Sequence, residues 1–340
     1  LKCEISVNLP VRIAHANLYY QRMGRHDVSR QSIFFEPNIW LRGNAWEIKA
    51  KMNSELPDLT TMVNYRDDSN PMNIILGNTQ LRNIHYYDIE GGKTFEGKKH
   101  SRLNINMGYH QTDNAVAYSL VFDKQTGVST VQPISVNGNY RMDLGIGYTR
   151  PLDKKEKLSI DNQASFNYNH NVDMAMVQGA TQSQRSIVNN WKISNVLKLN
   201  YRPDDNYEFT LHGGGTYYLI KSQREGFSNI HAGDYNIGVN VQVALPWKLQ
   251  LTTDLTMFAR RGYQLSEMNT TDWIWNAQLS RSFINKKLLV KLQGFDILRQ
   301  LSNTQYLMNA QGRTETWNNS IPRYMMLSLS WRFNVNPKKK

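Results

Sequence analysis

The sequence predicts an all-β protein, a transmembrane antiparallel β-barrel, and two observations support this fold class. The first is a strict alternation of apolar and polar residues in runs of about ten, the length of a membrane-crossing strand. It is clearest from Tyr235 to Leu245, where every odd-numbered residue is apolar. Successive strand residues point to opposite faces, so such a run has an apolar wall and a polar wall. The second is that short connections alternate with long polar ones, the asymmetry of outer-membrane barrels.

Composition is compatible with this fold. The chain of 340 residues contains no run of about 18 apolar residues, which excludes a transmembrane helix. Its mean hydropathy of −0.57 does not oppose a barrel, because half of each barrel strand is polar. The 18 Tyr, 11 Phe and 8 Trp are enough for aromatic girdles at both membrane interfaces. The basic residues behind the net charge of +12 are scattered, which favours solvated turns and predicts no nucleic-acid partner.

Strands are predicted from the C-terminus backwards. The clear ones are 322–333, 287–298, 272–283, 247–260, 233–245, 206–220, 187–201, 157–170, 138–150, 115–123, 101–111 and 82–94. Weaker alternation predicts further strands at Ile5–Leu9, Leu18–Gln21, Ile33–Leu41 and Ile48–Met52. The total is about 14–16 strands. Residues 56–82 have mixed polarity and contain two prolines, so they are expected to form an irregular connector.

Connections between these strands differ in length. Short turns are expected at 110–114, 151–157, 202–206, 246 and 284–286, and long segments at 171–186, 221–231, 261–271 and 301–321. A soluble β-sandwich, the alternative fold, has no reason to keep long and short connections on separate ends. Asp143 and Asp161 lie within predicted strands. A charge facing lipid is costly, so both are expected to face the lumen.

The sequence shows no catalytic, metal-binding or cofactor-binding motif. Its single cysteine, Cys3, cannot form an internal disulfide. The eight histidines lack the spacing of metal ligands, so no metal and no cofactor is predicted. No Ser/His/Asp arrangement is evident, so no enzyme is predicted; the weighed alternative is a barrel hydrolase in which His212 and Asp143 meet in space. Residues 213–215, three glycines, lie inside a strand and are no phosphate loop, and Gly91–Gly92 predicts a hairpin or bulge.

Three sets of residues resemble those of a known family. They are Ser32–Pro37; Asp67–Pro71 followed by Gly77, Asn78 and Leu81; and the terminal set Asp272–Ala277, Phe295–Leu298 and Arg323–Leu327. Together with the strand pattern they resemble the barrel domain of TonB-dependent outer-membrane receptors, in the subfamily described as outer-membrane beta-barrel proteins. The resemblance extends over nearly the whole chain.

This resemblance implies a place in the cell outer membrane of a Gram-negative bacterium and a 22-stranded barrel with a plugged lumen. It also implies an N-terminal plug, a short segment that binds the energy-coupling protein TonB, and import of a nutrient that the sequence does not identify. The chain has fewer strands and no recognisable plug. We therefore expect residues 1–334 to be the C-terminal part of a longer barrel; the alternative is a complete, repurposed barrel.

The last predicted strand resembles the assembly signal of outer-membrane barrels. Its apolar face is expected to be recognised by the barrel-assembly machinery and consists of Met325, Leu327, Leu329, Trp331 and Phe333. The residues after it, 335–340, end in three lysines and are expected to form a basic periplasmic tail.

Three functions remain open from the sequence. The first is import, with substrate captured by the connections 171–186 and 301–321; Tyr217, Tyr218 and Trp317 are candidate contacts by position alone, so the substrate-binding residues are unknown. The second is a non-transporting barrel that scaffolds an envelope complex, with a surface lipoprotein as partner. The third is a passive porin, because a barrel of about 16 strands leaves an aqueous channel. All three place the chain against outer-membrane lipid.

Overall fold

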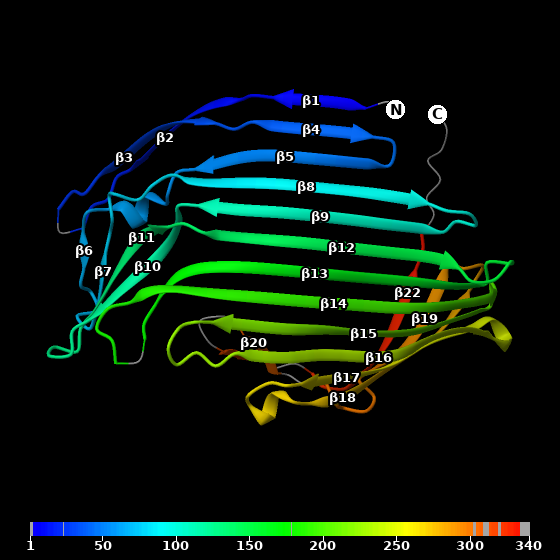
Figure 1. Ribbon diagram of the computed structural model, residues 1–340. Helices are drawn as coiled ribbons and strands as arrows, with labels where there is room; N and C mark the ends of the chain where they lie inside the picture. Colours follow the sequence, from blue (N-terminus) through cyan, green and yellow to red (C-terminus); the bar gives the residue numbers. More distant parts are fainter. Residues whose placement is uncertain are drawn as a thin grey trace, which may run out of the picture.

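The computed structural model describes residues 3–22, 24–177, 179–301, 304–308, 313–318 and 321–333. One antiparallel sheet of 14 strands dominates the fold (Figure 1). In sheet order its strands are β1 (Glu4–Asn8), β4 (Asn38–Gly43), β5 (Trp46–Glu55), β8 (Ile84–Glu96), β9 (Arg102–Asp113), β12 (Asn139–Pro151), β13 (Leu158–Ala175), β14 (Gln184–Asp204), β15 (Tyr207–Ser222), β16 (Ile230–Leu245), β17 (Leu249–Arg261), β18 (Thr271–Phe283), β19 (Leu288–Phe295) and β22 (Tyr324–Trp331).

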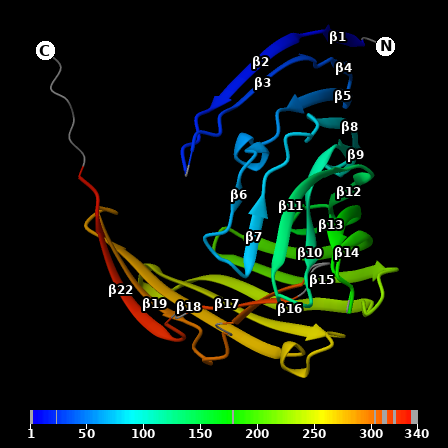
Figure 2. The ribbon, with the colours of Figure 1, turned by 90° about the vertical axis from the view of Figure 1, so that its left-hand side faces the viewer.

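The sheet is strongly curved and open. Seen towards the strand ends, the strands follow an arc from β1 to β22, with a gap between these two edges (Figure 2). Among the described residues β1 pairs only with β4, and β22 only with β19. Chain neighbours in the arc from β12 to β19 are also sheet neighbours, as in an up-and-down barrel wall.

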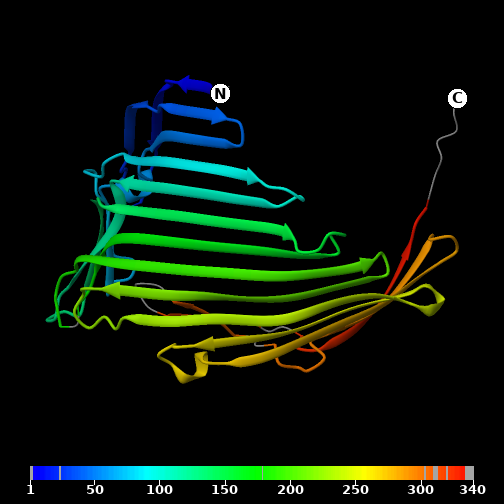
Figure 3. The same cartoon turned by 45° about the vertical axis from the view of Figure 1, so that its right-hand side comes forward.

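The connections separate by length between the two ends of the sheet (Figure 1, Figure 3). At the short-turn end they are 44–45, 97–101, 152–157, 205–206, 246–248 (η2, Pro246–Lys248) and 284–287. At the long-connector end they are 9–37, 56–83, 114–138, 176–183, 223–229, 262–270 (with η3, Ser266–Met268) and 296–323 (with β20, Thr304–Met308, and β21, Arg313–Trp317). The predicted asymmetry is confirmed.

Two connectors near the N-terminal edge build a second layer. A four-stranded sheet, here called the mouth sheet, consists of β10 (Ala115–Phe122), β11 (Ser129–Val136), β7 (Asn73–Leu76) and β6 (Arg66–Asp67). Figure 2 shows it on the concave side of the arc. With η1 (Leu59–Met62) it encloses a small core in which Leu81 and Met62 are buried. Phe122 N donates to the Thr181 carbonyl (2.6 Å) and Leu120 N to Ser183 Oγ (2.9 Å), which ties the mouth sheet to the β13–β14 connector.

The outermost strands are continued by a hairpin. β2 (Val11–Leu18) and β3 (Val28–Phe35) pair with each other and prolong β1 and β4 beyond Pro10 and Pro37. The predicted strand Ile33–Leu41 is therefore present but interrupted. The predicted strand Leu18–Gln21 is wrong, because β2 ends at Leu18.

Several other expectations are corrected by the pairing. Segment 115–123 is a strand, but it belongs to the mouth sheet, and 110–114 is no barrel turn, since β9 pairs directly with β12. Alternation shows that a segment is extended but not which strand it pairs with. Residues 56–82 contain η1, β6 and β7. Gly91–Gly92 continues β8 without a break. The connections 171–186 and 221–231 shrink to 176–183 and 223–229, because the flanking strands extend further.

The register aligns all the apolar rows on one face, here called the outer face. Ile237 lies opposite Gly213 and Met257, and Leu292 opposite Leu279 and Leu327. Aromatic rings also follow one another across strands β9, β12, β13 and β14. Their centroid separations are 6.0 Å for Tyr109–Tyr140, 5.8 Å for Tyr140–Tyr168 and 5.1 Å for Tyr168–Trp191. No helix among the described residues has the length and apolar character needed to cross a membrane.

Candidate functional site

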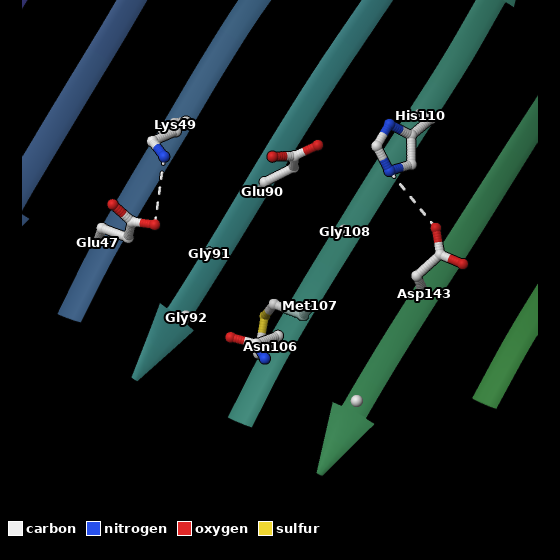
Figure 4. A pocket seen from close by; sticks show the side chains of 11 residues that line it. Glu47, Lys49, Glu90, Gly91, Gly92, Asn106, Met107, Gly108, His110 and Asp143 are labelled. Carbon is white, nitrogen blue, oxygen red and sulfur yellow. Dashed lines mark hydrogen bonds and ion pairs between the residues drawn. The ribbon is translucent and has the colours of Figure 1, made fainter. Parts of the chain in front are cut away.

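A polar hollow lies on the inner face, opposite the apolar rows, across β5, β8, β9 and β12 (Figure 4). Its volume is about 320 Å³. The inner-face residues that line it are Glu47, Lys49, Glu90, Gly92, Asn106, Gly108, His110, Asp143 and Gly145. Acidic, basic and imidazole side chains thus lie together on adjacent strands, because the alternation places them on the face away from the apolar rows.

Glycines on three adjacent strands line this hollow. Gly108 pairs with both Glu90 and Asp143, and Gly145 pairs with Asn106. A Cβ at Gly145 would meet nothing within 4 Å, so this position is open space. A Cβ at Gly92 would lie 2.6 Å from Asn106 Oδ1, so the Asn106 amide could not keep its place beside a larger residue. The floor of the hollow is therefore backbone.

His110 connects two carboxylates at one edge of the hollow. Its Nδ1 lies 2.6 Å from Asp88 Oδ1, and its Nε2 lies 3.4 Å from Asp143 Oδ2. Figure 4 shows the His110 ring pointing towards Asp143 across the strand gap. Arg141 Nε donates to Asp143 Oδ2 (2.7 Å), and the Asn167 amide donates to the other oxygen. These are charge-assisted contacts, the stronger class of hydrogen bond.

Further charges surround this network. Lys51 Nζ lies 3.5 Å from Asp88 Oδ2, and Lys49 Nζ lies 3.2 Å from Glu47 Oε1. Glu90 is exposed between these groups and forms no ion pair within the described ranges. The hollow thus offers donors and acceptors of both signs to a polar solute or to another segment in the lumen. In the described part of the chain no group of three or more His, Cys, Asp or Glu side chains is arranged to hold a metal.

A second inner cluster lies near the long-connector end. Tyr263, in the β17–β18 connector, donates its hydroxyl to Asp234 Oδ1 (2.8 Å), and burial raises the pKa of Tyr263. The ring packs against an apolar cluster that includes Ile220 and Ala232. On the same inner face Lys192 Nζ lies 5.9 Å from the ring centre of Tyr218. This cluster anchors one connector to the wall.

The positions predicted from sequence are placed as follows. Asp143 and Asp161 both lie on the inner face, and Thr149 Oγ1 donates to Asp161 (2.9 Å). The weighed pairing of His212 with Asp143 is wrong, since His212 Nε2 faces Thr256 Oγ1 at 3.3 Å. His110 lies where the predicted strand 101–111 and the predicted turn 110–114 overlap. In the structure it is within β9, and the odd-numbered apolar residues from Leu103 place it on the opposite, polar face.

The three residues predicted as substrate contacts, Tyr217, Tyr218 and Trp317, do not lie on one face of the sheet. Tyr218 lies on the inner face and Tyr217 on the outer face, where its hydroxyl lies 3.1 Å from His231 Nδ1. Trp317 lies in β21 and is exposed. Only Tyr218 can therefore contact a solute in the lumen from the wall itself.

The predicted assembly residues lie along β22. Leu327 faces Leu292 and Leu329 faces Val290, so both belong to the outer face, and Met325 continues that row. The rings of Trp331 and Phe333 are 6.2 Å apart at the short-turn end. Their recognition by an assembly machinery stays a prediction, and the predicted tail, 335–340, lies outside the described residues.

Comparison with known proteins agrees with this architecture. The model of the family described as "Outer membrane protein beta-barrel family" matches residues 180–331. No curated protein sequence gives a significant match. Two solved structures match the chain. A mutant of the ferric enterobactin receptor PfeA from Pseudomonas aeruginosa matches with a TM-score of 0.51 and 11% identity, covering 92% of this chain and 48% of that one. The copper transporter OprC matches with a TM-score of 0.47 and 12% identity, covering 84% and 46%.

The chain therefore spans about half the length of these solved structures. It is an outer-membrane β-barrel protein of the cell outer membrane, and the predicted resemblance to TonB-dependent receptors is confirmed for the fold. The outer face, with its apolar rows, is accordingly the face turned to lipid. The inner face, with the polar hollow, is turned to the lumen.

Proposed function

We propose that this chain forms barrel wall of a TonB-dependent receptor that imports a nutrient through a plugged lumen. The single observation that supports this most is the 14-stranded wall with a receptor-like fold and all its long connectors at one end. In outer-membrane barrels the long connectors face the outside and the short turns face the periplasm. Binding would then occur at the long-connector end. No catalytic step belongs to this proposal.

The inner face of the wall would line the path of the imported solute through the barrel. The mouth sheet lies over the concave side beside the entrance, and the hollow around His110 lies on the wall further in. Mixed charges there suit exchange of hydrogen bonds with a passing polar solute or with a plug segment. We propose that the plug contacts TonB, as the resemblance implies, and that the short-turn end faces that partner.

The backbone N–H and C=O groups of the two edge strands, β1 and β22, must also find hydrogen-bond partners in the membrane. Unpaired N–H and C=O groups in hydrocarbon each cost several kcal/mol. In the working barrel β1 and β22 must therefore pair with each other or with further strands. Closure by further strands is the arrangement that import through a wide, plugged barrel requires.

Uptake measurements test this function directly. Cells with and without the gene are compared for growth on limiting nutrients, first with TonB present and then with TonB depleted. Import by this receptor predicts a gene-dependent growth advantage that disappears without TonB. An advantage that persists without TonB, together with steady conductance of the purified protein in planar bilayers, would instead establish the passive porin.

A scaffold is the second candidate, and the mouth sheet favours it. Met72, Ile75 and Tyr118 are large side chains that remain at least 48% exposed on or beside this sheet. Such a rigid, partly apolar surface suits a partner at the cell surface, for which a surface lipoprotein is our proposal. Cross-linking from Tyr118 in intact cells would detect such a partner. A partner that persists in cells showing no TonB-dependent growth advantage would support the scaffold over import.

A further inference from the structure

Cations interrupt the apolar outer face near the short-turn end. Arg150, opposite Ile160, is one of them, and Lys93 and Arg281 are two others. Lys93 of β8 lies opposite Trp46 and Ile105 in the register. Arg281 of β18 lies opposite Leu249 and Val290. Both positions belong to the lipid-facing rows, and the cross-strand neighbours of these two cations are all apolar or aromatic.

The two sites share one local geometry. Lys93 Nζ lies 4.6 Å from the ring centre of Phe95, two residues nearer the short-turn end. Arg281 Cζ lies 4.8 Å from the ring centre of Phe283, again two residues nearer that end. Among the described residues neither cation forms an ion pair with a carboxylate. Each cation therefore keeps its charge available at the level where aromatic side chains mark a membrane interface.

The wall beside Lys93 is also hollowed. A recess of about 570 Å³ is lined by apolar groups of Trp46, Ile48, Ile105 and Met107. Its floor is Gly91, where an added Cβ would lie 3.6 Å or more from any other atom. The sheet could hold a larger residue there, but glycine leaves the recess open to the lipid side. An apolar recess with a cation at its interfacial end matches an amphiphile with an acyl chain and an anionic head.

We propose that Lys93 and Arg281 bind the phosphate groups of anionic phospholipids in the periplasmic leaflet, with an acyl chain of the lipid at Lys93 lying in the recess over Gly91. Long cationic side chains near an interface extend their charge to the headgroups while their stems stay in the apolar layer. The unpaired positive charge complements the phosphate, and the short-turn end identifies the leaflet. The proposal depends on the outer-membrane location and not on import, so the two can fail separately.

Native mass spectrometry of the full protein purified from outer membranes tests this proposal. The detergent-solubilised protein is titrated with phosphatidylglycerol and with phosphatidylcholine of the same acyl chains. The wild type is expected to bind phosphatidylglycerol more tightly. Lys93→Gln and Arg281→Gln should each weaken phosphatidylglycerol binding about fivefold at the affected site, the contribution typical of one interfacial cation. Binding of phosphatidylcholine should not change.

Two further variants separate the cation from the recess. Lys98→Gln removes an exposed lysine of the neighbouring β8–β9 turn and should leave both lipids unaffected. Gly91→Leu keeps Lys93 but fills the recess, and should weaken both lipids at that site. The proposal is overturned if Lys93→Gln and Arg281→Gln bind phosphatidylglycerol like the wild type, if Lys98→Gln loses as much as they do, or if the wild type does not distinguish the two lipids. Heat-modifiable migration on gels confirms that each variant is folded. If Lys93→Gln does not fold, the lipid binding of Gly91→Leu decides whether the recess at that site holds a lipid.

Discussion

The outer and inner faces of the same 14-stranded sheet follow opposite rules. On β9, Met107 of the outer face is 60% exposed, whereas the His110 side chain of the inner face is only 21% exposed. Outer-face residues contact one another through apolar packing and ring contacts. Inner-face residues form polar networks such as the one in which His110 lies between Asp88 and Asp143. Exposed apolar side chains such as Met107, arranged in rows on one face, are what a barrel wall turns to lipid.

The difference between the faces depends on parity alone. Because side chains alternate with a period of two, a shift of one residue exchanges the two environments. Neighbouring residues of one strand are therefore matched probes: they share backbone, strand and depth, and differ only in face.

The largest effect is expected from a charge placed on the outer face. Val241→Arg puts a guanidinium into the apolar row between Phe209 and Thr253, and should destabilise the folded protein by about 2–4 kcal/mol near the bilayer midplane. Asn240→Arg is the matched control on the inner face and should cost much less. Urea unfolding in lipid vesicles measures both. A larger loss from Asn240→Arg would mean that the face assignment is reversed.

The inner network should give the next largest effect. His110→Leu removes the ring between Asp88 and Asp143 and should cost about 1.5 kcal/mol, because hydrogen bonds to charged groups contribute roughly 1.5–3 kcal/mol. His212→Leu is the control, since this ring has one long contact with Thr256. If both variants lose the same free energy of unfolding in urea, the contacts of His110 with the two carboxylates do not stabilise the protein.

A smaller effect is expected from the ring ladder on the outer face. Tyr140 lies between Tyr109 and Tyr168 and also stacks on His170 at 4.9 Å. Tyr140→Leu keeps the apolar bulk but removes all three ring contacts. Aromatic pairs contribute about 0.5–1.5 kcal/mol beyond their buried area. Tyr118→Leu on the mouth sheet is the control outside the membrane. The same unfolding measurement should rank Tyr140→Leu clearly above Tyr118→Leu, and the opposite order would remove the ladder as a stabilising element.

The smallest effect concerns pH at the short-turn end. Hydrogen bonds from the Leu158 and Lys155 backbone N–H groups lower the pKa of Asp153. The folded pKa lies below the unfolded value of about 3.9, so the stabilisation is present above that pH and is lost as pH falls through the lowered pKa. Hydrogen exchange of the turn peptide should therefore become faster relative to intrinsic rates below about pH 4 in the wild type. Asp153→Asn should lack this pH dependence; an identical profile would contradict the assignment.

Much of the wall was predictable from sequence, for a physical reason that particular strands show. β16, β17 and β18 were located nearly residue by residue, because a strand with lipid on one side and water on the other must alternate. β10 was located equally well but placed in the wrong sheet. Local alternation determines which way the side chains of β10 face. Its pairing with β11 depends on a turn and on packing against residues that are distant in the chain.

The candidate site was less predictable. Asp143 was correctly expected in the lumen, because a carboxylate in lipid is costly. Its partnership with His110 depends on β9 pairing directly with β12, although the connector 114–138, which contains the β10–β11 hairpin, separates these strands in the chain. The recess at Lys93 could not be predicted either, because Gly91–Gly92 predicts a hairpin or bulge, whereas the register shows an uninterrupted strand.

The amino-acid sequence by itself determined the all-β class, the two faces of each wall strand and the contrast between short turns and long connectors. These features follow from one residue's neighbours along the chain and from the solvent on each side. Only the tertiary structure decided which strands pair, that β6, β7, β10 and β11 form a separate sheet, and which charges meet in the hollow. Those outcomes depend on contacts between residues far apart in the chain, and the alternation of side chains contains no information about them.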